Sequence, residues 1–422
     1  MNFGNLHMNL TNQNMNSICS INQIKMQKHQ TFVRRWFENG NKKLLLFHGL
    51  GSGKTASSLF AAEGLLKKNH IQQVYIATPA SLRKNYEKEF KSSLFGYNSV
   101  PKSYKILSYQ GFLKIANQDN LKNSLVIIDE VQNVISDDGI IYKKLFKLLV
   151  TKAPSSIYVI LLSGTPMFDK AHEIALTINL LAPTDPMPVS KFYKQYIKKN
   201  NVINTNDFMK KVNPYISAFS GVSPAAYAKR IDTTILCPMS KLQGDSYKKT
   251  VGGINITNMV YSQAFLSGPR MVCNCIYKNG QFGRKYRPSK KIIKELFISN
   301  LQNYSSKFKK CIDHLKSNNM QAFVYSNFVE AGGVLDFEIA LEANGFDKNS
   351  YGRFISGKDD NNTKLVNNFN SGKIRIIIGS PAMKEGISLK NCREVHILDP
   401  YWNNSRTEQI IGRAIRFCSH VS

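Results

Sequence analysis

Acidic residues are scarce in this chain of 422 residues, which has 28 Asp and Glu against 57 Lys and Arg. The resulting formal net charge of +29 disfavours cationic partners and favours a polyanionic one, of which nucleic acid is the usual example. A basic protein that needs no such partner is the plainer alternative. The net charge therefore indicates a nucleic-acid partner but does not distinguish DNA from RNA.

Cysteines are few and widely spaced. The chain has 7 of them, an odd number, and this pattern is typical of reduced thiols in an intracellular compartment. Cys273 and Cys275 form a lone C-x-C pair with no second pair nearby, so they lack the four ligands of a structural zinc site. The composition thus argues against a disulfide-stapled secreted domain.

Long apolar runs are absent as well. No stretch approaches the roughly 18 apolar residues of a membrane span, so no membrane partner is expected. The Asn-rich N-terminus lacks a basic region followed by an apolar core, which excludes a secretory signal. We expect residues 1–27 to be a disordered or extended lead-in.

Short apolar runs alternate with amphipathic stretches in two parts of the chain, which predicts βαβ units on parallel sheets. The expected strands of the first set are 43–49, 73–79, 104–109, 124–130 and 157–166, and those of the second are 322–328, 354–357, 374–381 and 394–400. A Lys-, Asn- and Tyr-rich region separates the sets. We predict an α/β fold with one parallel-sheet domain at 28–185, a largely helical insertion and linker at 186–300, and a second domain at 301–422.

A glycine-rich turn joins the first expected strand to a helix. It reads Gly51, Ser52, Gly53, Lys54 and Thr55, the order of a phosphate-binding P-loop. Glycines let backbone N–H groups approach phosphate, and the helix N-terminus adds a positive dipole end. Lys54 would neutralise the outer phosphates, and the Thr55 hydroxyl would hold Mg²⁺. A chance match on an ordinary turn is the alternative. The sequence thus predicts ATP with Mg²⁺ as its cofactors.

Two adjacent acids, Asp129 and Glu130, end the strand expected at 124–130. Beside a phosphate loop, Asp129 would hold Mg²⁺ and Glu130 would orient and deprotonate the attacking water. An acidic pair at a solvated strand end is common, so the assignment depends on its pairing with the loop.

Smaller signals surround these motifs. Ser163 and Thr165 end a third strand, where their hydroxyls could hydrogen-bond the acidic pair and report nucleotide state, although Gly and Pro make plain turns there too. Gln30 carries an amide that could read adenine, or could be an ordinary helix residue. Near the C-terminus, Arg413 and Arg416 are spaced for one helical face. They could stabilise transition-state charge, or belong to a basic surface helix.

The order of these motifs resembles that of superfamily 2 helicases and translocases, which have two RecA-like domains. The segments that carry the resemblance are GLGSGKT, DEVQ, SGTP, GSPAMKEGISL and QIIGRAIR, which includes Gln409. YIATPASLRKNY (75–86) and FVYSNF (323–328) resemble two further motifs of the group. The resemblance spans residues 28 to 420 and implies catalytic roles for Glu130, Gln409, Arg413 and Arg416.

DPYWNNSRTEQIIGRAIR (399–416) resembles the Snf2-like arrangement. LLLFHGLGSGKT (44–55) and GRAIRFCSH (412–420) are similar to the branch of large nucleocytoplasmic DNA viruses, which includes nucleoside triphosphate phosphohydrolase I and early transcription factor small subunits. The resemblance implies a DNA-dependent ATPase that works with the viral RNA polymerase, in the virion or the host cytoplasm.

The chain departs from this pattern at several positions. His48 replaces the first glycine of the P-loop pattern, and Gln132 replaces the common His of the acidic motif, which is expected to affect coupling more than hydrolysis. Lys384 and the two residues after it replace a Gly-rich cellular motif. The chain also ends soon after Arg416, where relatives continue, so the second domain is expected to be truncated.

Nucleic-acid contacts should come from hydroxyl, amide and basic groups at strand ends, which meet phosphates without reading bases. A solvated loop is an equally good interpretation of each one. The candidates are Thr78, Pro79 (through its backbone), Arg83, Ser108, Tyr109, Ser326, Asn327 and Lys384.

The favoured function is a nucleic-acid-stimulated ATPase, a helicase or translocase on double-stranded DNA in viral transcription. Two alternatives remain open: an ATP-dependent RNA helicase, and a non-catalytic nucleic-acid-binding subunit of a transcription complex. Because Lys54, Thr55, Asp129 and Glu130 are all present, the residues favour the enzyme.

Overall fold

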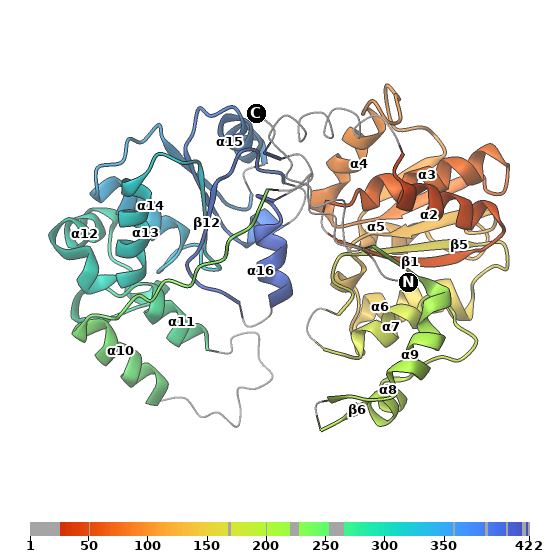
Figure 1. The fold of residues 1–422 in the computed structure, drawn as a ribbon, viewed down its shortest axis with the longest axis horizontal. Helices are drawn as coiled ribbons and strands as arrows, with labels where there is room; N and C mark the ends of the chain where they lie inside the picture. The colour runs from red at the N-terminus through yellow and green to blue at the C-terminus, as the bar shows by residue number, and fades with distance from the viewer. Residues whose placement is uncertain are drawn as a thin grey trace, which may run out of the picture. The chain divides into compact units, whose positions relative to one another are not determined.

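The computed structural model describes residues 26–49, 51–167, 170–199, 201–219, 228–252, 266–357, 359–384, 387–401, 404–415 and 419–420. The chain forms two compact units that divide between residues 226 and 227 (Figure 1). Of the predicted lead-in at 1–27, residues 1–25 lie outside the described part. No helix within the described ranges is long and apolar enough to cross a bilayer.

The first unit is built on a parallel sheet with the strand order β3-β2-β4-β5-β1-β8. Its strands are β1 (Lys43–His48), β2 (Gln73–Ala77), β3 (Tyr104–Leu107), β4 (Ser124–Ile128), β5 (Tyr158–Ser163) and β8 (Ile216–Phe219). β4 is buried at every residue because it lies between β2 and β5 and is covered on both faces. This explains why its sequence, SLVII, is an almost continuous apolar run.

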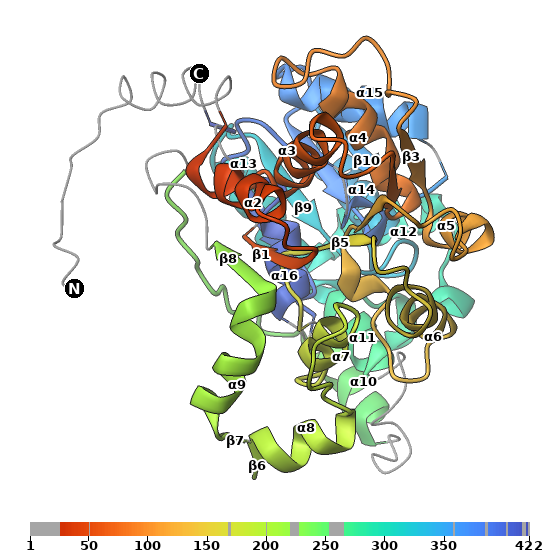
Figure 2. The same cartoon turned by 90° about the vertical axis from the view of Figure 1, so that its right-hand side faces the viewer.

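Helices cover both faces of this sheet, as the views of Figures 1 and 2 agree. Successive residues of β1 alternate between the two cores: Leu44 and Leu46 face one, and Leu45 faces the other. The first core includes residues of α2 (Lys28–Glu38), α3 (Lys54–Lys67) and α4 (Arg83–Phe90). The second includes residues of α5 (Tyr109–Ile115), α6 (Ile140–Phe146), α7 (Glu173–Asn179) and α8 (Val189–Tyr196).

The region predicted as a helical insertion, 186–300, is divided between the two units. Its first part adds α8, the hairpin of β6 (Ile197–Lys198) and β7 (Asn201–Val202), α9 (Thr205–Val212) and β8 to the first unit. The sequence analysis did not anticipate β8, because four residues carry too little periodicity to indicate a strand. β8 pairs with β1 and thereby covers an edge that would otherwise be open.

The second unit contains a smaller parallel sheet with the order β10-β11-β9-β12. Its strands are β9 (Ala322–Tyr325), β10 (Tyr351–Phe354), β11 (Ile376–Gly379) and β12 (Glu394–Ile397). The strand expected at 354–357 was placed too late, since β10 ends at Phe354. The α/β class with two parallel-sheet domains is confirmed.

Helices also cover both faces of the second sheet. One core holds residues of α12 (Lys290–Tyr304), α13 (Ser306–Ser317) and α14 (Val334–Ala343), and the other holds residues of α15 (Asp359–Asn370) and α16 (Asn404–Ile411). Two further helices, α10 (Lys241–Gly252) and α11 (Ser267–Asn274), belong to this unit and come from the region predicted as an insertion.

Gly333, directly before α14, has no room for a side chain. A Cβ built there would overlap the backbone carbonyl of Phe328, which accepts a hydrogen bond of 3.0 Å from the Val334 N–H. By contrast, a Cβ at Gly244 in α10 would meet nothing within 4 Å.

We expect Gly333→Ala to destabilise the second unit by on the order of 2 kcal/mol, because backbone must move to relieve the overlap. Denaturant unfolding followed by circular dichroism measures the change. Gly244→Ala is the matched control and should be neutral or slightly stabilising, since Ala favours a helix interior over Gly. Equal effects of the two substitutions would contradict this packing.

Candidate nucleotide site and the residues around it

The predicted site residues of the first unit follow the carboxyl ends of its parallel strands. The glycine-rich loop follows β1, the acidic pair follows β4, and Ser163 ends β5. Because carboxyl ends of parallel strands share one edge of a sheet, these segments are brought together although they are far apart in sequence. Ligands of open α/β sheets bind at this edge.

The glycine-rich loop has the backbone conformation that its glycines predict. Gly51 and Gly53 both have φ of +75°, in the left-handed region that favours glycine. Gly53 is the N-cap of α3, and no side chain caps that helix. The first N–H groups of α3 are therefore available to an anion such as phosphate.

The side chain of Lys54 folds back over this loop. Its Nζ donates to the carbonyl oxygens of His48 at 2.8 Å and Gly49 at 3.2 Å. Ser52 is buried and donates from its hydroxyl to the Gly49 carbonyl at 2.7 Å. Thr55 lies in the first turn of α3 and is half-buried. An ammonium, a hydroxyl and a helix N-terminus at one loop fit the phosphates and Mg²⁺ of a nucleotide.

Gln30 of α2 lies against the same loop. It is 6% exposed, and its Oε1 accepts from the Gln27 N–H at 2.8 Å, which fixes the amide at the start of α2. A Cβ on Gly53 would stand 2.8 Å from the Gln30 Nε2, and the φ of +75° is what favours glycine at residue 53. The structure thus places Gln30 beside the loop, as an adenine-reading role would require.

A cluster of imidazole and phenyl rings packs beside the glycine-rich loop, and the sequence analysis did not predict it. His29 stacks on Phe219 with ring centroids 3.9 Å apart, and its Nε2 lies 2.8 Å from the Ser52 carbonyl oxygen. His48 is fully buried, with its Nε2 3.0 Å from the Ser217 hydroxyl. Burial lowers the pKa of His48 to about 3, with smaller contributions from His29 and Lys54. His48 therefore serves as a neutral packing residue at the base of the loop.

The acidic pair is held tightly at the end of β4. Asp129 is 6% exposed, and its Oδ1 accepts from the Glu130 N–H at 2.9 Å. Burial raises the pKa of Asp129, Glu130 raises it further, and Lys54 opposes the shift. The Tyr109 hydroxyl donates to the carbonyl oxygens of Asp129 at 2.6 Å and Glu130 at 3.1 Å. A buried carboxylate near an ammonium suits a divalent cation.

Glu130 has an unusual backbone conformation, with φ of +48° and ψ of +52°. Such a left-handed conformation is uncommon for a residue with a side chain and is kept only where the surroundings enforce it. Here the Tyr109 hydroxyl and the turn into residues 131–133 enforce it. The conformation turns Glu130 away from the strand direction of Asp129.

Gln132 connects the acidic pair to the end of β5. Its Nε2 donates to Glu130 Oε2 at 2.5 Å, and its Oε1 accepts from the Ser163 hydroxyl at 2.7 Å. The Ser163 Oγ in turn accepts from the Thr165 N–H at 3.0 Å. The structure therefore joins all the residues that the sequence analysis assigned to coupling, Gln132, Ser163 and Thr165, in one hydrogen-bonded chain ending on Glu130.

The predicted nucleic-acid contacts of the first unit differ widely in exposure. Thr78 is fully buried, and its hydroxyl donates to Asp129 Oδ2 at 3.4 Å. Tyr109 is also buried on the acidic pair, so neither side chain is offered to a nucleic acid. This corrects the assumption that strand-end hydroxyls face outward. Ser108 accepts from the Gly111 N–H as the N-cap of α5, Pro79 is half-buried, and Arg83 is exposed.

In the second unit, Ser326 and Asn327 surround a buried carboxylate that the sequence analysis did not assign. Asp399 is 2% exposed and accepts from the Asn327 N–H through both oxygens, at 3.1 and 2.9 Å. Ser326 is fully buried, so its predicted contact with nucleic acid is not available in this structure. Asn327 is half-buried and donates from its amide to the Asp399 carbonyl at 2.7 Å. Lys384 ends a short 3-10 helix, Pro381–Lys384.

The arginine-bearing segment does not form the continuous helix that was expected. α16 contains Gln409 but ends at Ile411, and residues 413 and 414 continue in a tight turn with i→i−3 bonds. The Arg413 carbonyl accepts from the Leu389 N–H at 2.9 Å, which draws the backbone out of helical geometry. Arg413 is 6% exposed, not on a basic surface. Arg416 lies outside the described residues.

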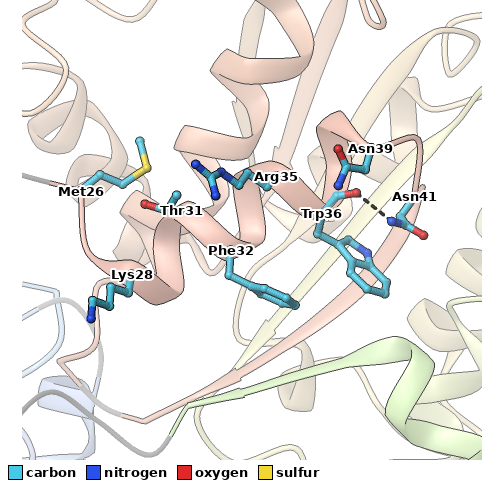
Figure 3. A pocket seen from close by; sticks show the side chains of 8 residues that line it. All are labelled: Met26, Lys28, Thr31, Phe32, Arg35, Trp36, Asn39 and Asn41. Atoms are coloured by element: carbon cyan, nitrogen blue, oxygen red, sulfur yellow. Dashed lines mark hydrogen bonds between the residues drawn. The ribbon is translucent and has the colours of Figure 1, made fainter.

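A surface hollow of about 600 Å³ lies along α2, and Figure 3 shows its side chains. It is lined by Met26, Lys28, Thr31, Phe32, Arg35, Trp36, Asn39 and Asn41. Gln30, Val33 and Phe37 lie on the buried side of the same helix. The hollow is therefore on the opposite side of α2 from Gln30 and is separate from the glycine-rich loop.

Comparison with known families agrees with this arrangement. Residues 27–314 match the SNF2-related domain, and residues 306–418 match the helicase conserved C-terminal domain. The two parallel-sheet units thus correspond to a SNF2-related domain followed by a helicase C-terminal domain. The chain belongs to the SNF2-related family.

Similar proteins come from several large DNA viruses. A protein of Acanthamoeba polyphaga mimivirus, named as a candidate ATP-dependent RNA helicase, is 35% identical over 95% of this chain and 80% of its own length. The early transcription factor 70 kDa subunit of Yaba monkey tumor virus is 25% identical over 98% of this chain and 72% of its own length. Among solved structures, the SWI2/SNF2 ATPase core of Sulfolobus solfataricus with double-stranded DNA has a TM-score of 0.44 at 18% identity, covering 94% of this chain and 86% of that one.

The buried His48 predicts a pH dependence of stability. Its pKa in the folded chain is about 3, below the ordinary value of 6.5, so the unfolded chain binds more protons between these values. Stability should therefore fall as the pH drops below about 6.5, by up to about 1.4 kcal/mol per pH unit.

Urea unfolding at about pH 7.5 and about pH 5.5 measures this dependence. His48→Asn should reduce the loss of folding stability at the lower pH, because Asn does not bind a proton when the chain unfolds. His70→Asn is the control, since His70 is exposed in the same unit. The same pH slope in the wild type and His48→Asn would show that His48 is not responsible.

Proposed function

We propose that this chain is a nucleic-acid-stimulated ATPase of helicase superfamily 2 that translocates on double-stranded DNA in viral transcription. The observation that carries the proposal is the hydrogen-bonded chain from Glu130 through Gln132 to Ser163 and Thr165. It connects a candidate catalytic carboxylate, beside the glycine-rich loop, to a separate strand end. A binding protein without turnover has no evident need for such a connection.

The nucleotide would be held by residues already gathered at the loop. Lys54 and the N-terminus of α3 suit the phosphates, Thr55 and Asp129 suit Mg²⁺, and Gln30 suits the adenine edge. When bound, Mg²⁺ supplies neutralisation of charge on the phosphate oxygens. The ammonium of Lys54 is held by two carbonyl oxygens, at 2.8 and 3.2 Å, and can exchange them for phosphate oxygens.

Glu130 is the candidate general base. Its carboxylate is half-buried and accepts from Gln132 through Oε2. The left-handed backbone and the Tyr109 bond fix its direction. A carboxylate positioned in this way can orient a water and accept its proton. Asp129, more deeply buried, would stay on the metal.

Gln132 gives a physical route for coupling. Any movement of the loop after β5 shifts Ser163 or Thr165, and their bonds pass the shift through Gln132 to Glu130. Nucleic acid that reorders this loop would thereby change the orientation of the base. Gln409, Arg413 and Arg416 are proposed to act on transition-state charge from the second unit, as the family resemblance implies.

Double-stranded DNA is the favoured track because the SNF2-related domain spans residues 27–314. RNA remains the second candidate, since the mimivirus relative carries an RNA helicase name. The likeness to a poxvirus early transcription factor subunit supports a role in viral transcription beside an RNA polymerase, in the virion or the host cytoplasm. The net charge of +29 supports a polyanionic track of either kind.

Phosphate release tests the proposal directly. At low salt, which strengthens phosphate-backbone contacts, we expect release to be stimulated most by double-stranded DNA, the proposed track, less by single-stranded DNA and least by RNA. Glu130→Gln should lower release by about 10²–10⁴-fold, since the amide cannot accept a proton. Absence of phosphate release under every condition would contradict the proposed ATPase activity. Stimulation by RNA alone would contradict the proposal that DNA is the track.

The coupling route predicts a separate phenotype for Gln132→Ala. Loss of its two hydrogen bonds should reduce the DNA-stimulated rate by up to about tenfold and reduce basal release by a smaller factor. Gln72→Ala is the matched control, because Gln72 is exposed in the same unit. An equal loss of basal and stimulated release would mean that Gln132 supports the acidic pair without coupling it to the track.

A further inference from the structure

Three side chains of the second unit converge at the start of β12. Glu394 and His396 are two residues apart on this strand, so they lie on the same side of it. β12 is at the edge of its sheet. His314, near the end of α13, completes the group. None of these residues belongs to the candidate nucleotide site.

The geometry is that of a ligand set arranged around one point. The Glu394 carboxylate lies 3.1 Å from His314 Nε2 through Oε1 and 3.2 Å from His396 Nε2 through Oε2. All three ligand atoms lie within 4.8 Å of one another. In a tetrahedral zinc site with bonds of about 2.0–2.1 Å, ligand atoms stand roughly 3.4 Å apart. The two measured separations are close to this value.

We propose that His314, Glu394 and His396 bind a divalent transition metal, with Zn²⁺ the best match. Two imidazoles and one carboxylate suit zinc and its borderline neighbours, whereas Mg²⁺ and Ca²⁺ prefer oxygen ligands throughout. Three protein ligands leave a fourth position for water. In the bound form each ring keeps its proton on Nδ1 and coordinates through Nε2.

The surroundings prepare the group for a cation. Asn318 donates from Nδ2 to Glu394 Oε1 at 2.9 Å, which orients the carboxylate. The side chains of Glu394 and His396 are each 14% exposed and hence restricted, while His314 is 46% exposed and free to adjust. Burial lowers the pKa of His396, so its ring is neutral and ready to coordinate near neutral pH.

The location indicates a structural or regulatory metal rather than a catalytic one. Glu394 is the first residue of β12, at the opposite end of the strand from Asp399 and the motif that contains it. A metal here would tie the end of α13 to the edge strand. Its binding is therefore independent of ATP hydrolysis and of the choice between DNA and RNA.

Zinc titration of the chelator-treated full chain tests the site. In excess Mg²⁺, which occupies oxygen-ligand sites, calorimetry should show one equivalent of Zn²⁺ bound. His396→Gln and Glu394→Gln should weaken this binding by at least about tenfold, because each removes a ligand. His70→Gln, an exposed histidine of the other unit, should not change it. Zinc should also raise the unfolding midpoint of the wild type.

His314→Gln keeps the test decisive if a substitution in the strand impairs folding, since His314 is the most exposed of the three. It should retain the wild-type midpoint without zinc and lose the rise with zinc. Absence of stoichiometric binding would overturn the site and leave an ion-paired cluster. Binding that is unchanged in the histidine variants, as when zinc is held by cysteine thiols elsewhere, would overturn it equally.

Discussion

The burial of the Asp129 carboxylate at the end of the central strand β4 organises most of the first unit's site. A charged group in this position needs partners, and the surrounding segments supply them: the Glu130 N–H, the Thr78 hydroxyl and the nearby ammonium of Lys54. The Glu130 N–H comes from the same strand end, whereas Thr78 follows β2 and Lys54 begins the helix that follows β1. Satisfying one carboxylate therefore fixes the mutual positions of motifs that are distant in sequence.

The second unit uses a similar device. Asp399, just beyond β12, is buried, and burial raises its pKa while the Asn327 N–H opposes the shift. Arg270 reaches it with a separation of 3.5 Å, and the guanidinium also lies over the rings of Phe328 and Tyr401, with 5.4 and 5.3 Å to their centroids. The Asp-Pro turn that suggested a Snf2-like chain is thus a packing centre that joins the ends of β9 and β12.

The sequence was most informative where a pattern repeats or a motif has one physical reason. Continuous apolar runs located β1, β2, β4 and β5, because strands buried on both faces leave no other signature. The glycine-rich turn could be located because left-handed residues at Gly51 and Gly53 restrict the choice of amino acid. Gln132, Ser163 and Thr165 were predicted to take part in coupling, but their mutual contacts could not be predicted, since those depend on the three-dimensional positions of two strand ends.

Failures arose where tertiary context overrides local preference. Thr78, Tyr109 and Ser326 were expected to be exposed at strand ends, but all three are buried. The Thr78 hydroxyl donates to the Asp129 carboxylate, and the Tyr109 hydroxyl donates to the Asp129 backbone carbonyl. The helix over Gln409 stops early because a loop N–H takes the Arg413 carbonyl. His29 and Phe219 gave no signal, because a ring stack between residues so far apart leaves no periodicity.

The last strand of the first unit has a mechanical consequence. β8 pairs with β1 along its length, and its final residue, Phe219, accepts a hydrogen bond of 2.8 Å from the Gly49 N–H. The Gly49 carbonyl is also one of the two that accept a hydrogen bond from the Lys54 ammonium. A displacement of β8 would therefore be transmitted through the Gly49 hydrogen bond to the loop that holds Lys54.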